Sequence, residues 1–87
     1  MITREEVFER VRTTMHELFE IDPNTIKLET KLIDELSLDS IDAIDLAARL
    51  EELTKKRLTE DKLRGLRTVQ DVVDLTFGML QETGEES

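Results

Sequence analysis

The order of hydrophobic and polar positions along the chain predicts helices and no strands. In the first segment, apolar side chains recur every three or four residues, as on one face of a helix. These positions are Val7, Phe8, Val11, Met15, Leu18 and Phe19. Thr3 followed by Glu6 has the pattern of a capping box, and Asp22-Pro23-Asn24 interrupts the helical spacing. The pattern therefore predicts a helix over residues 4–20.

Three more helices are predicted in the second half of the chain. The first covers residues 40–55, where Asp39 is a favourable N-cap and Asp42 adds negative charge to the first turn. A short helix over residues 60–64 and a longer one over residues 69–81 follow. The residues that cap or end these two helices are Thr59, Gly65, Thr68 and Asp71.

The connection between the first two helices is unusually long and contains no glycine. Its apolar residues are Ile21, Ile26, Leu28, Leu32, Ile33, Leu36 and Leu38. A long loop in a compact domain usually packs or functions, so we expect this one to lie across the helices, with a short helical turn near residues 32–36. We expect a single domain over residues 1–81 and a flexible acidic tail over residues 82–87.

The helix over residues 40–55 has two apolar faces. On a helical wheel, one face is the expected core face, formed by Ala43, Leu46, Ala47, Leu50 and Leu53. The nearly opposite face, here termed the second stripe, is formed by Ile41, Ile44 and Ala48. Charged residues surround the second stripe: Asp42, Asp45, Arg49, Glu51 and Glu52. Either the stripe packs under the connection or the third helix, or it is an exposed surface that docks basic-rimmed partners.

Composition excludes several classes of site. The chain has 87 residues, no cysteine and one histidine, which excludes disulfides, thiolate metal sites and cysteine catalysis. No apolar run is long enough to span a membrane, and the acidic N-terminus is unlike a signal peptide. These two features predict a cytoplasmic location. The lack of cysteine and of a second histidine predicts that the protein is not an enzyme. His16 lies on the first helix with no predicted partner near Ser40, so we expect it to have a surface role.

Charge is distributed unevenly along the chain. The net charge is −9, with −6 over residues 34–52 and +4 over residues 53–67. Nucleic acids and anionic membranes are disfavoured as partners by the overall charge. A small acidic protein is better suited to basic patches on other proteins, where complementary charge speeds encounter.

Ser40 is an ordinary first-turn serine by position alone. A phosphate ester at its hydroxyl would nevertheless lie beside free backbone amides at the positive end of a helix dipole. The run LSLDSID over residues 36–42 resembles the phosphopantetheine attachment motif of acyl carrier proteins, in which Asp39, Ser40 and Ile41 match. The hydrophobic and acidic approach over residues 32–36 is also similar, and the resemblance extends over residues 3–81.

The resemblance implies an all-α, four-helix bundle with a short third helix and a long loop between helices one and two. It implies a 4'-phosphopantetheine arm on Ser40, added from coenzyme A by a phosphopantetheinyl transferase, with Asp39 helping to position Mg²⁺. The arm would hold acyl groups as thioesters, and the cargo would shelter near Leu46, Ala47 and Val72. The implied partner-binding residues are Ile41, Asp42, Ile44, Asp45, Ala48, Glu51 and Glu52.

The implied partners are acyl-loading, ketosynthase or acyltransferase enzymes with basic docking patches. They would belong to fatty-acid, polyketide or related lipid biosynthesis. The carrier itself is expected to be a monomer. Two features depart from the family pattern: Ser37 stands where glycine is usual, and the charge is uneven, with Arg49 inside the acidic face and a basic region over residues 53–67. The uneven charge favours a specialised carrier. The alternatives are a peptidyl or aminoacyl carrier, which usually has a glycine-rich approach to its serine, and an acidic helical interaction module without a cofactor.

Overall fold

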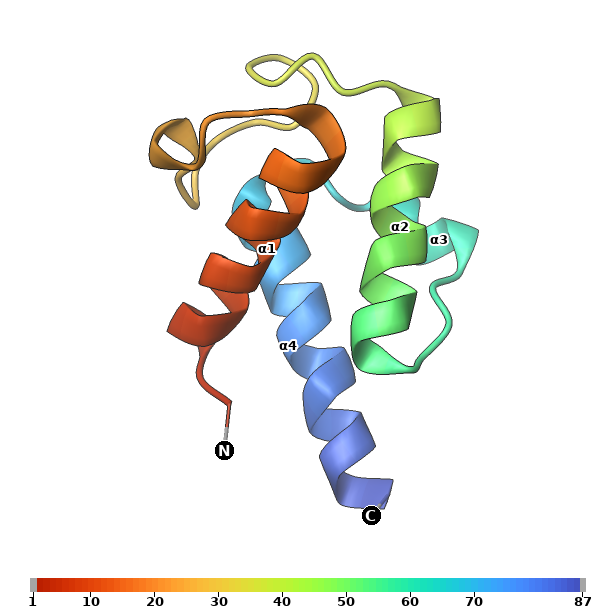
Figure 1. The fold of residues 1–87 in the computed structure, drawn as a ribbon. Helices are drawn as coiled ribbons and strands as arrows, with labels where there is room; N and C mark the ends of the chain where they lie inside the picture. The colour runs from red at the N-terminus through yellow and green to blue at the C-terminus, as the bar shows by residue number, and fades with distance from the viewer. Residues whose placement is uncertain (1, 87) are drawn as a thin grey trace.

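The computed structural model describes the backbone of residues 2–86 and the side chains of residues 2–81. Four α-helices and one short 3-10 helix follow in the order α1, η1, α2, α3 and α4 (Figure 1). They span Arg4–Phe19, Pro23–Thr25, Ser40–Thr54, Glu60–Arg64 and Val69–Glu86. Among the described residues there is no strand beyond an isolated bridge between Lys31 and Thr68. None of the described helices is long and apolar enough to cross a membrane.

The predicted helices are all present, and the bounds of the first three agree with the prediction to within one residue. The predicted end of α4 at residue 81 was wrong, because the helical backbone continues to Glu86. No proline follows Leu80 to end the helix. The residues that do follow it oppose a helix less strongly than proline would, so the helical backbone can continue. The flexibility expected of residues 82–87 stays a prediction, and Ser87 lies outside the described residues.

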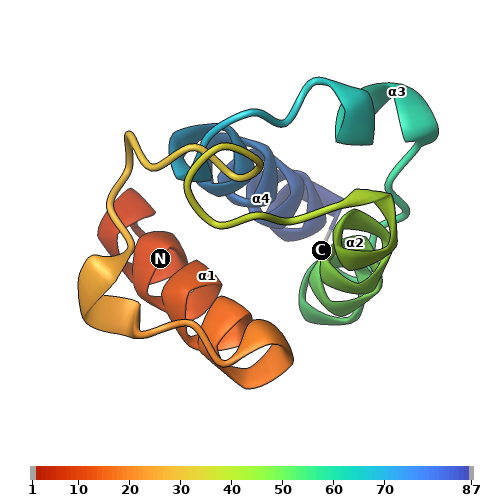
Figure 2. The same ribbon diagram turned by 90° about the horizontal axis from the view of Figure 1, so that it is seen from above.

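The three long helices enclose one apolar core. Helix α1 packs against both α2 and α4, and α2 also packs against α4. Seen from above, these helices surround a common centre, the connection crosses over their upper end, and α3 lies outside beside α2 (Figure 2). The helical residues of the buried cluster are Val7, Val11, Met15, Leu46, Leu50, Val69, Val72 and Val73. Burial of these side chains provides the main favourable term in folding.

The α1–α2 connection is pinned to the bundle, as predicted. Ile26, Leu32 and Leu38 bury their side chains in the core. The carbonyls of Thr30 and Leu28 accept hydrogen bonds from the first amides of α4, at 2.9 Å and 2.8 Å. These amides have no partner within their own helix, so the connection acts as a backbone cap for α4.

The expected helical turn near residues 32–36 takes the form of successive turns that are too short to count as a helix. The amide of Glu35 donates to the carbonyl of Lys31 at 3.1 Å, and the amide of Ser37 donates to the carbonyl of Ile33 at 3.0 Å. The amide of Leu38 also donates a hydrogen bond to the carbonyl of Leu32, at 3.1 Å. These bonds satisfy the backbone just before α2 begins.

Asp71 stabilises the start of α4. Its carboxylate accepts hydrogen bonds from the backbone amides of Arg67 and Thr68, at 2.9 Å and 3.1 Å. The hydroxyl of Thr68 accepts a bond from the amide of Asp71 at 3.3 Å. The two backbone amides, foremost that of Arg67, lower the pKa of the Asp71 carboxyl below its ordinary value of 3.8.

Asp71→Asn should therefore destabilise the protein near neutral pH and have less effect in acid. A lowered folded-state pKa gives stability that is present above the unfolded pKa and is lost as the pH falls through the folded value. We expect a loss of roughly 0.5–1 kcal/mol at neutral pH, since the variant loses charge-assisted bonds at a helix start. Urea unfolding at neutral pH and below pH 3.8 measures this, with the exposed Asp45→Asn as the control. A pH-independent difference would contradict the assigned cause.

Candidate functional site

Ser40 is the first residue of α2, and its side chain is exposed. A capping box fixes this helix start: the amide of Asp42 donates to Asp39 Oδ1 at 2.9 Å, and the amide of Asp39 donates to Asp42 Oδ2 at 3.1 Å. The backbone amides of Ser40 and Ile41 make no hydrogen bond with any described residue. An exposed hydroxyl therefore lies beside two free donors at the positive end of a helix, an arrangement that favours a phosphate ester.

Asp39 has two carboxylate oxygens, and capping occupies only Oδ1. Its other oxygen makes no hydrogen bond with the described residues and can face a cation. Among these residues there is no group of three or more histidine, cysteine or acidic side chains that could hold a metal ion. Asp39 can thus supply one ligand at most. His16 is exposed, and its Nδ1 lies 3.1 Å from the carbonyl oxygen of Ile21, which agrees with the predicted surface role.

The second stripe of α2 is exposed. Ile41 and Ile44 are 69% and 62% exposed, and Ala48 beside them is also exposed. Of the two interpretations left open by the sequence, burial under the connection or under α3 is therefore wrong. Two carboxylates on the same helix, Asp45 and Glu52, are exposed and make no bond or ion pair with the described part of the chain.

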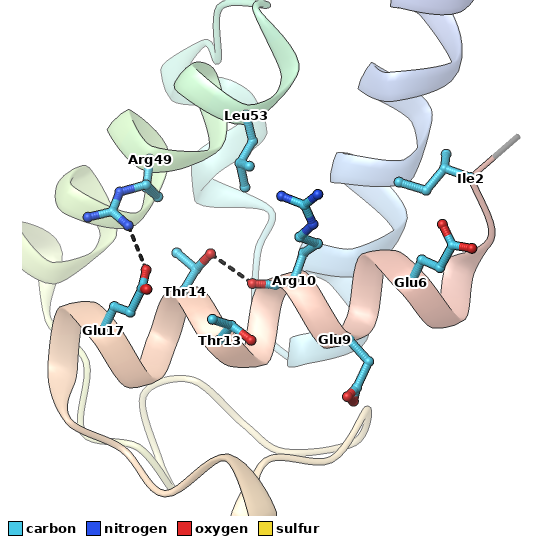
Figure 3. A pocket seen from close by; sticks show the side chains of 9 residues that line it. All are labelled: Ile2, Glu6, Glu9, Arg10, Thr13, Thr14, Glu17, Arg49 and Leu53. Atoms are coloured by element: carbon cyan, nitrogen blue, oxygen red, sulfur yellow. Dashed lines mark hydrogen bonds and ion pairs between the residues drawn. The ribbon is translucent and has the colours of Figure 1, made fainter.

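Other charged residues of α2 already have partners. Glu51 is half-buried, and its Oε2 accepts a hydrogen bond from the amide of Leu58 at 2.7 Å, which holds the loop leading to α3. Arg49 forms an ion pair with Glu17 of α1 at 2.9 Å, so it does not stand free among the carboxylates (Figure 3). The sequence indicated neither contact, because both depend on how the helices pack.

Two surface hollows lie near α2. The larger has a volume of about 620 Å³ and lies between α1 and α2, with the ion pair of Arg49 and Glu17 at one end (Figure 3). Ser40 does not line it, and most of its lining side chains are polar or charged. The smaller, of about 320 Å³, lies beside the site and includes Ser37, Leu38 and Asp42. Neither is lined by the expected cargo-sheltering residues, of which Leu46 is 2% exposed.

Ser37 has a left-handed backbone conformation, with φ of 58°. For a residue with a Cβ this region costs roughly 1–2 kcal/mol, whereas glycine enters it freely. The turn before α2 therefore has the geometry that glycine suits best. Glycine, which the related motif usually has at this position, would adopt this turn without strain, whereas Ser37 adopts it at an energetic cost.

Known proteins of one family are similar to this chain over most of its length. The family model described as the phosphopantetheine attachment site matches residues 9–76. "Acyl carrier protein 2" of Ralstonia nicotianae is 42% identical over 79 residues, which cover 91% of this chain and 98% of that protein. The chain belongs to the acyl carrier protein family.

Other relatives agree with this membership. The acyl carrier protein of Campylobacter concisus is 38% identical over 78% of this chain and 88% of its own length. The meromycolate extension acyl carrier protein of Mycobacterium leprae is 30% identical over 97% of this chain and 73% of its own length. The crystal structure of the Thermotoga maritima acyl carrier protein has a TM-score of 0.79 at 26% identity, covering 91% of this chain and 92% of that one.

These findings confirm the predicted four-helix fold and the predicted class. The protein is a carrier with a 4'-phosphopantetheine prosthetic group, and it acts as a partner of enzymes. The geometry of α2 agrees with this class, because its start suits a phosphate ester.

Ser37→Gly should stabilise this carrier. The variant removes the Cβ from a left-handed residue, although glycine also gains freedom in the unfolded chain, so we expect a net gain of roughly 0.5–1 kcal/mol. Chemical unfolding followed by circular dichroism measures the change. Ser37→Ala is the matched control, since it keeps the Cβ and should give no such gain. A destabilised Ser37→Gly protein would show that the serine hydroxyl, and not the backbone, decides this turn.

Proposed function

We propose that Ser40 is the residue that carries the 4'-phosphopantetheine arm. The arm's terminal thiol holds acyl groups as thioesters, and the protein delivers them to enzymes of fatty-acid, polyketide or related lipid biosynthesis. The observation that carries this proposal is the position of Ser40: an exposed hydroxyl at the start of α2, beside two unpaired amides. Its place within the matched residues 9–76 supports the same assignment.

The residues around Ser40 have separate tasks in loading. Ser40 Oγ attacks the phosphorus next to the pantetheine in coenzyme A, and the phosphoanhydride bond breaks so that adenosine 3',5'-bisphosphate leaves. The new ester is held near the amides of Ser40 and Ile41, while the serine proton passes to the transferase or to solvent. When Mg²⁺ is bound during loading, the free oxygen of Asp39 would supply one ligand to it, and the other ligands would come from coenzyme A and a phosphopantetheinyl transferase. The Oδ1 cap keeps Asp39 in place throughout.

The exposed half of α2 docks partner enzymes. Ile41, Ile44 and Ala48 provide the apolar contact, and Asp45 and Glu52 provide free carboxylates for basic docking patches. Asp42 and Glu51 were expected to contribute as well, but each already accepts a backbone hydrogen bond. They add to the negative potential of the face without leaving their structural partners.

Cargo enters by separating the helices. Leu46, Ala47 and Val72 are buried and already in contact with other core residues, so a long acyl chain among them requires α2 to move. The relative from Mycobacterium leprae bears the name of a meromycolate extension carrier, and this chain fits that broad class of lipid carriers. We propose that it works as a monomer in the cytoplasm.

Incubation with coenzyme A, Mg²⁺ and a broad-specificity phosphopantetheinyl transferase tests the attachment site. Intact-protein mass spectrometry should show the gain of one phosphopantetheinyl group on the unaltered chain and none on Ser40→Ala. Ser37→Ala is the matched control, because Ser37 is also exposed and lies three residues earlier, and it should still be loaded.

Two results would contradict the assignment. If Ser40→Ala is still loaded, the arm is attached to another residue. If only Ser37→Ala loses loading, the arm is attached to Ser37. Failure of the unaltered chain with several transferases would favour a helical interaction module without the cofactor.

Substitutions in the second stripe test docking separately from loading. Ile44→Arg and Asp45→Lys should slow acyl transfer by partner enzymes roughly 10-fold or more while leaving helical circular dichroism intact, because both side chains are exposed. Glu29→Lys makes the same charge change as Asp45→Lys at an exposed position of the connection and should have little effect. Equal slowing in Glu29→Lys would attribute the effect to net charge and not to this surface.

A further inference from the structure

A second charged surface of opposite sign lies next to α2. It consists of the exposed side chains of Lys55, Arg57, Lys62 and Arg64, which lie in the one segment from the C-cap of α2 to the last residue of α3 and are here termed the basic surface; the exposed Glu60 and Asp61 lie in the same segment. Residues 53–67 contain half of the chain's lysines and arginines and have a formal charge of +4. The rest of the chain has −13, the difference between the total of −9 and this +4.

The cations of the basic surface are almost unpaired. Within the part of the chain that the structure describes, the side chains of Lys55, Arg57 and Lys62 make no ion pair. Arg64 lies 3.8 Å from Glu60, and both side chains are more than three-quarters exposed, so this pair contributes little. In contrast, three arginines elsewhere are paired with carboxylates: Arg4 with Asp74, Arg12 with Glu9 and Arg49 with Glu17.

Folding energetics account for only part of this cluster. Lys55 caps the C-terminus of α2, where the helix dipole favours a cation. Arg57 lies beyond that last turn, and α3 spans only five residues, so its dipole explains little of Lys62 and Arg64. Like charges gathered on one surface repel each other in the folded state. Folding stability therefore does not explain why these cations occur together, whereas a binding role does.

We propose that the basic surface binds an acidic patch on a protein partner, next to the basic patch that receives α2. Both views show α3 beside α2, on the side away from α1, so one partner can reach both helices (Figures 1 and 2). From Asp45 to Lys55 the helix rises about 15 Å, at 1.5 Å per residue, so the partner's basic and acidic patches lie side by side within about that distance along α2. This proposal goes beyond loading of Ser40 and does not depend on it.

Charge complementarity favours a protein over other anions. A membrane or a nucleic acid is negative over its whole surface, so an approach to α3 would also bring it near the carboxylates Asp45 and Glu52 of α2. Exposed charges closer than about 10 Å are only partly screened at ordinary ionic strength, so these carboxylates oppose such an approach. A folded protein can place acidic and basic patches side by side, and it can therefore match both surfaces at once.

Titration of the isotope-labelled, unmodified chain with a hexaglutamate peptide tests the basic surface by NMR. Amide shifts should concentrate at residues 55–64, weaken with added salt and be absent with hexaglutamine. The variant Arg57→Gln/Lys62→Gln should bind roughly 3- to 10-fold more weakly, as expected for the loss of two exposed ion pairs. Both side chains are exposed, and circular dichroism checks that the variant keeps its fold.

Lys27→Gln/Lys31→Gln is the matched control, since it removes the same charge from exposed positions of the connection. It should bind hexaglutamate as the unaltered chain does. The proposal is overturned by absent or scattered shifts, or by an equal loss in the control. Stronger binding of the same residues to phosphatidylglycerol vesicles or to a short DNA duplex would instead assign the surface to a membrane or to nucleic acid.

Discussion

The backbone bonds between the α1–α2 connection and the start of α4 are the constraint on which the position of Ser40 depends. The first amides of α4 need acceptors, and the carbonyls of Leu28 and Thr30 provide them. Leu32 and Leu38 add buried side chains to the same anchor. Because Leu38 is only two residues before Ser40, a long connection that could have been mobile instead brings the serine to a defined place. The capping box of α2 then sets the direction in which the hydroxyl is presented.

Helix α2 serves three purposes with three of its faces. Leu46 and Leu50 are buried in the core and hold the helix in the bundle. Arg49 and Glu51 form contacts with α1 and with the loop before α3, so part of the charge on the helix is structural. Ile41, with its neighbours of the second stripe, remains exposed and accessible to other proteins. An exposed apolar strip among carboxylates lowers solubility little and offers partners a contact that combines burial with charge.

The sign of the charge changes along this side of the molecule, from the carboxylates of α2 to the cations of residues 55–64. An acidic face alone can meet a basic patch in more than one orientation, whereas cations beside it restrict the choice. The arm proposed for Ser40 lies at the start of α2, so such a restriction would also fix the end from which the cargo approaches a partner. The charge pattern thus links the site to the way in which it is presented, without any contact at Ser40 itself.

The sequence by itself determined where the four α-helices begin and the class of protein. Helical spacing and capping residues act over a few neighbouring positions, so the pattern around Asp39 and Thr59 was enough to place the starts of α2 and α3. Only the tertiary structure decided that the second stripe of α2 is exposed, and that Glu51 and Arg49 have internal partners. The left-handed turn at Ser37 also emerged only there. These features depend on contacts between segments far apart in the chain, which local periodicity does not contain.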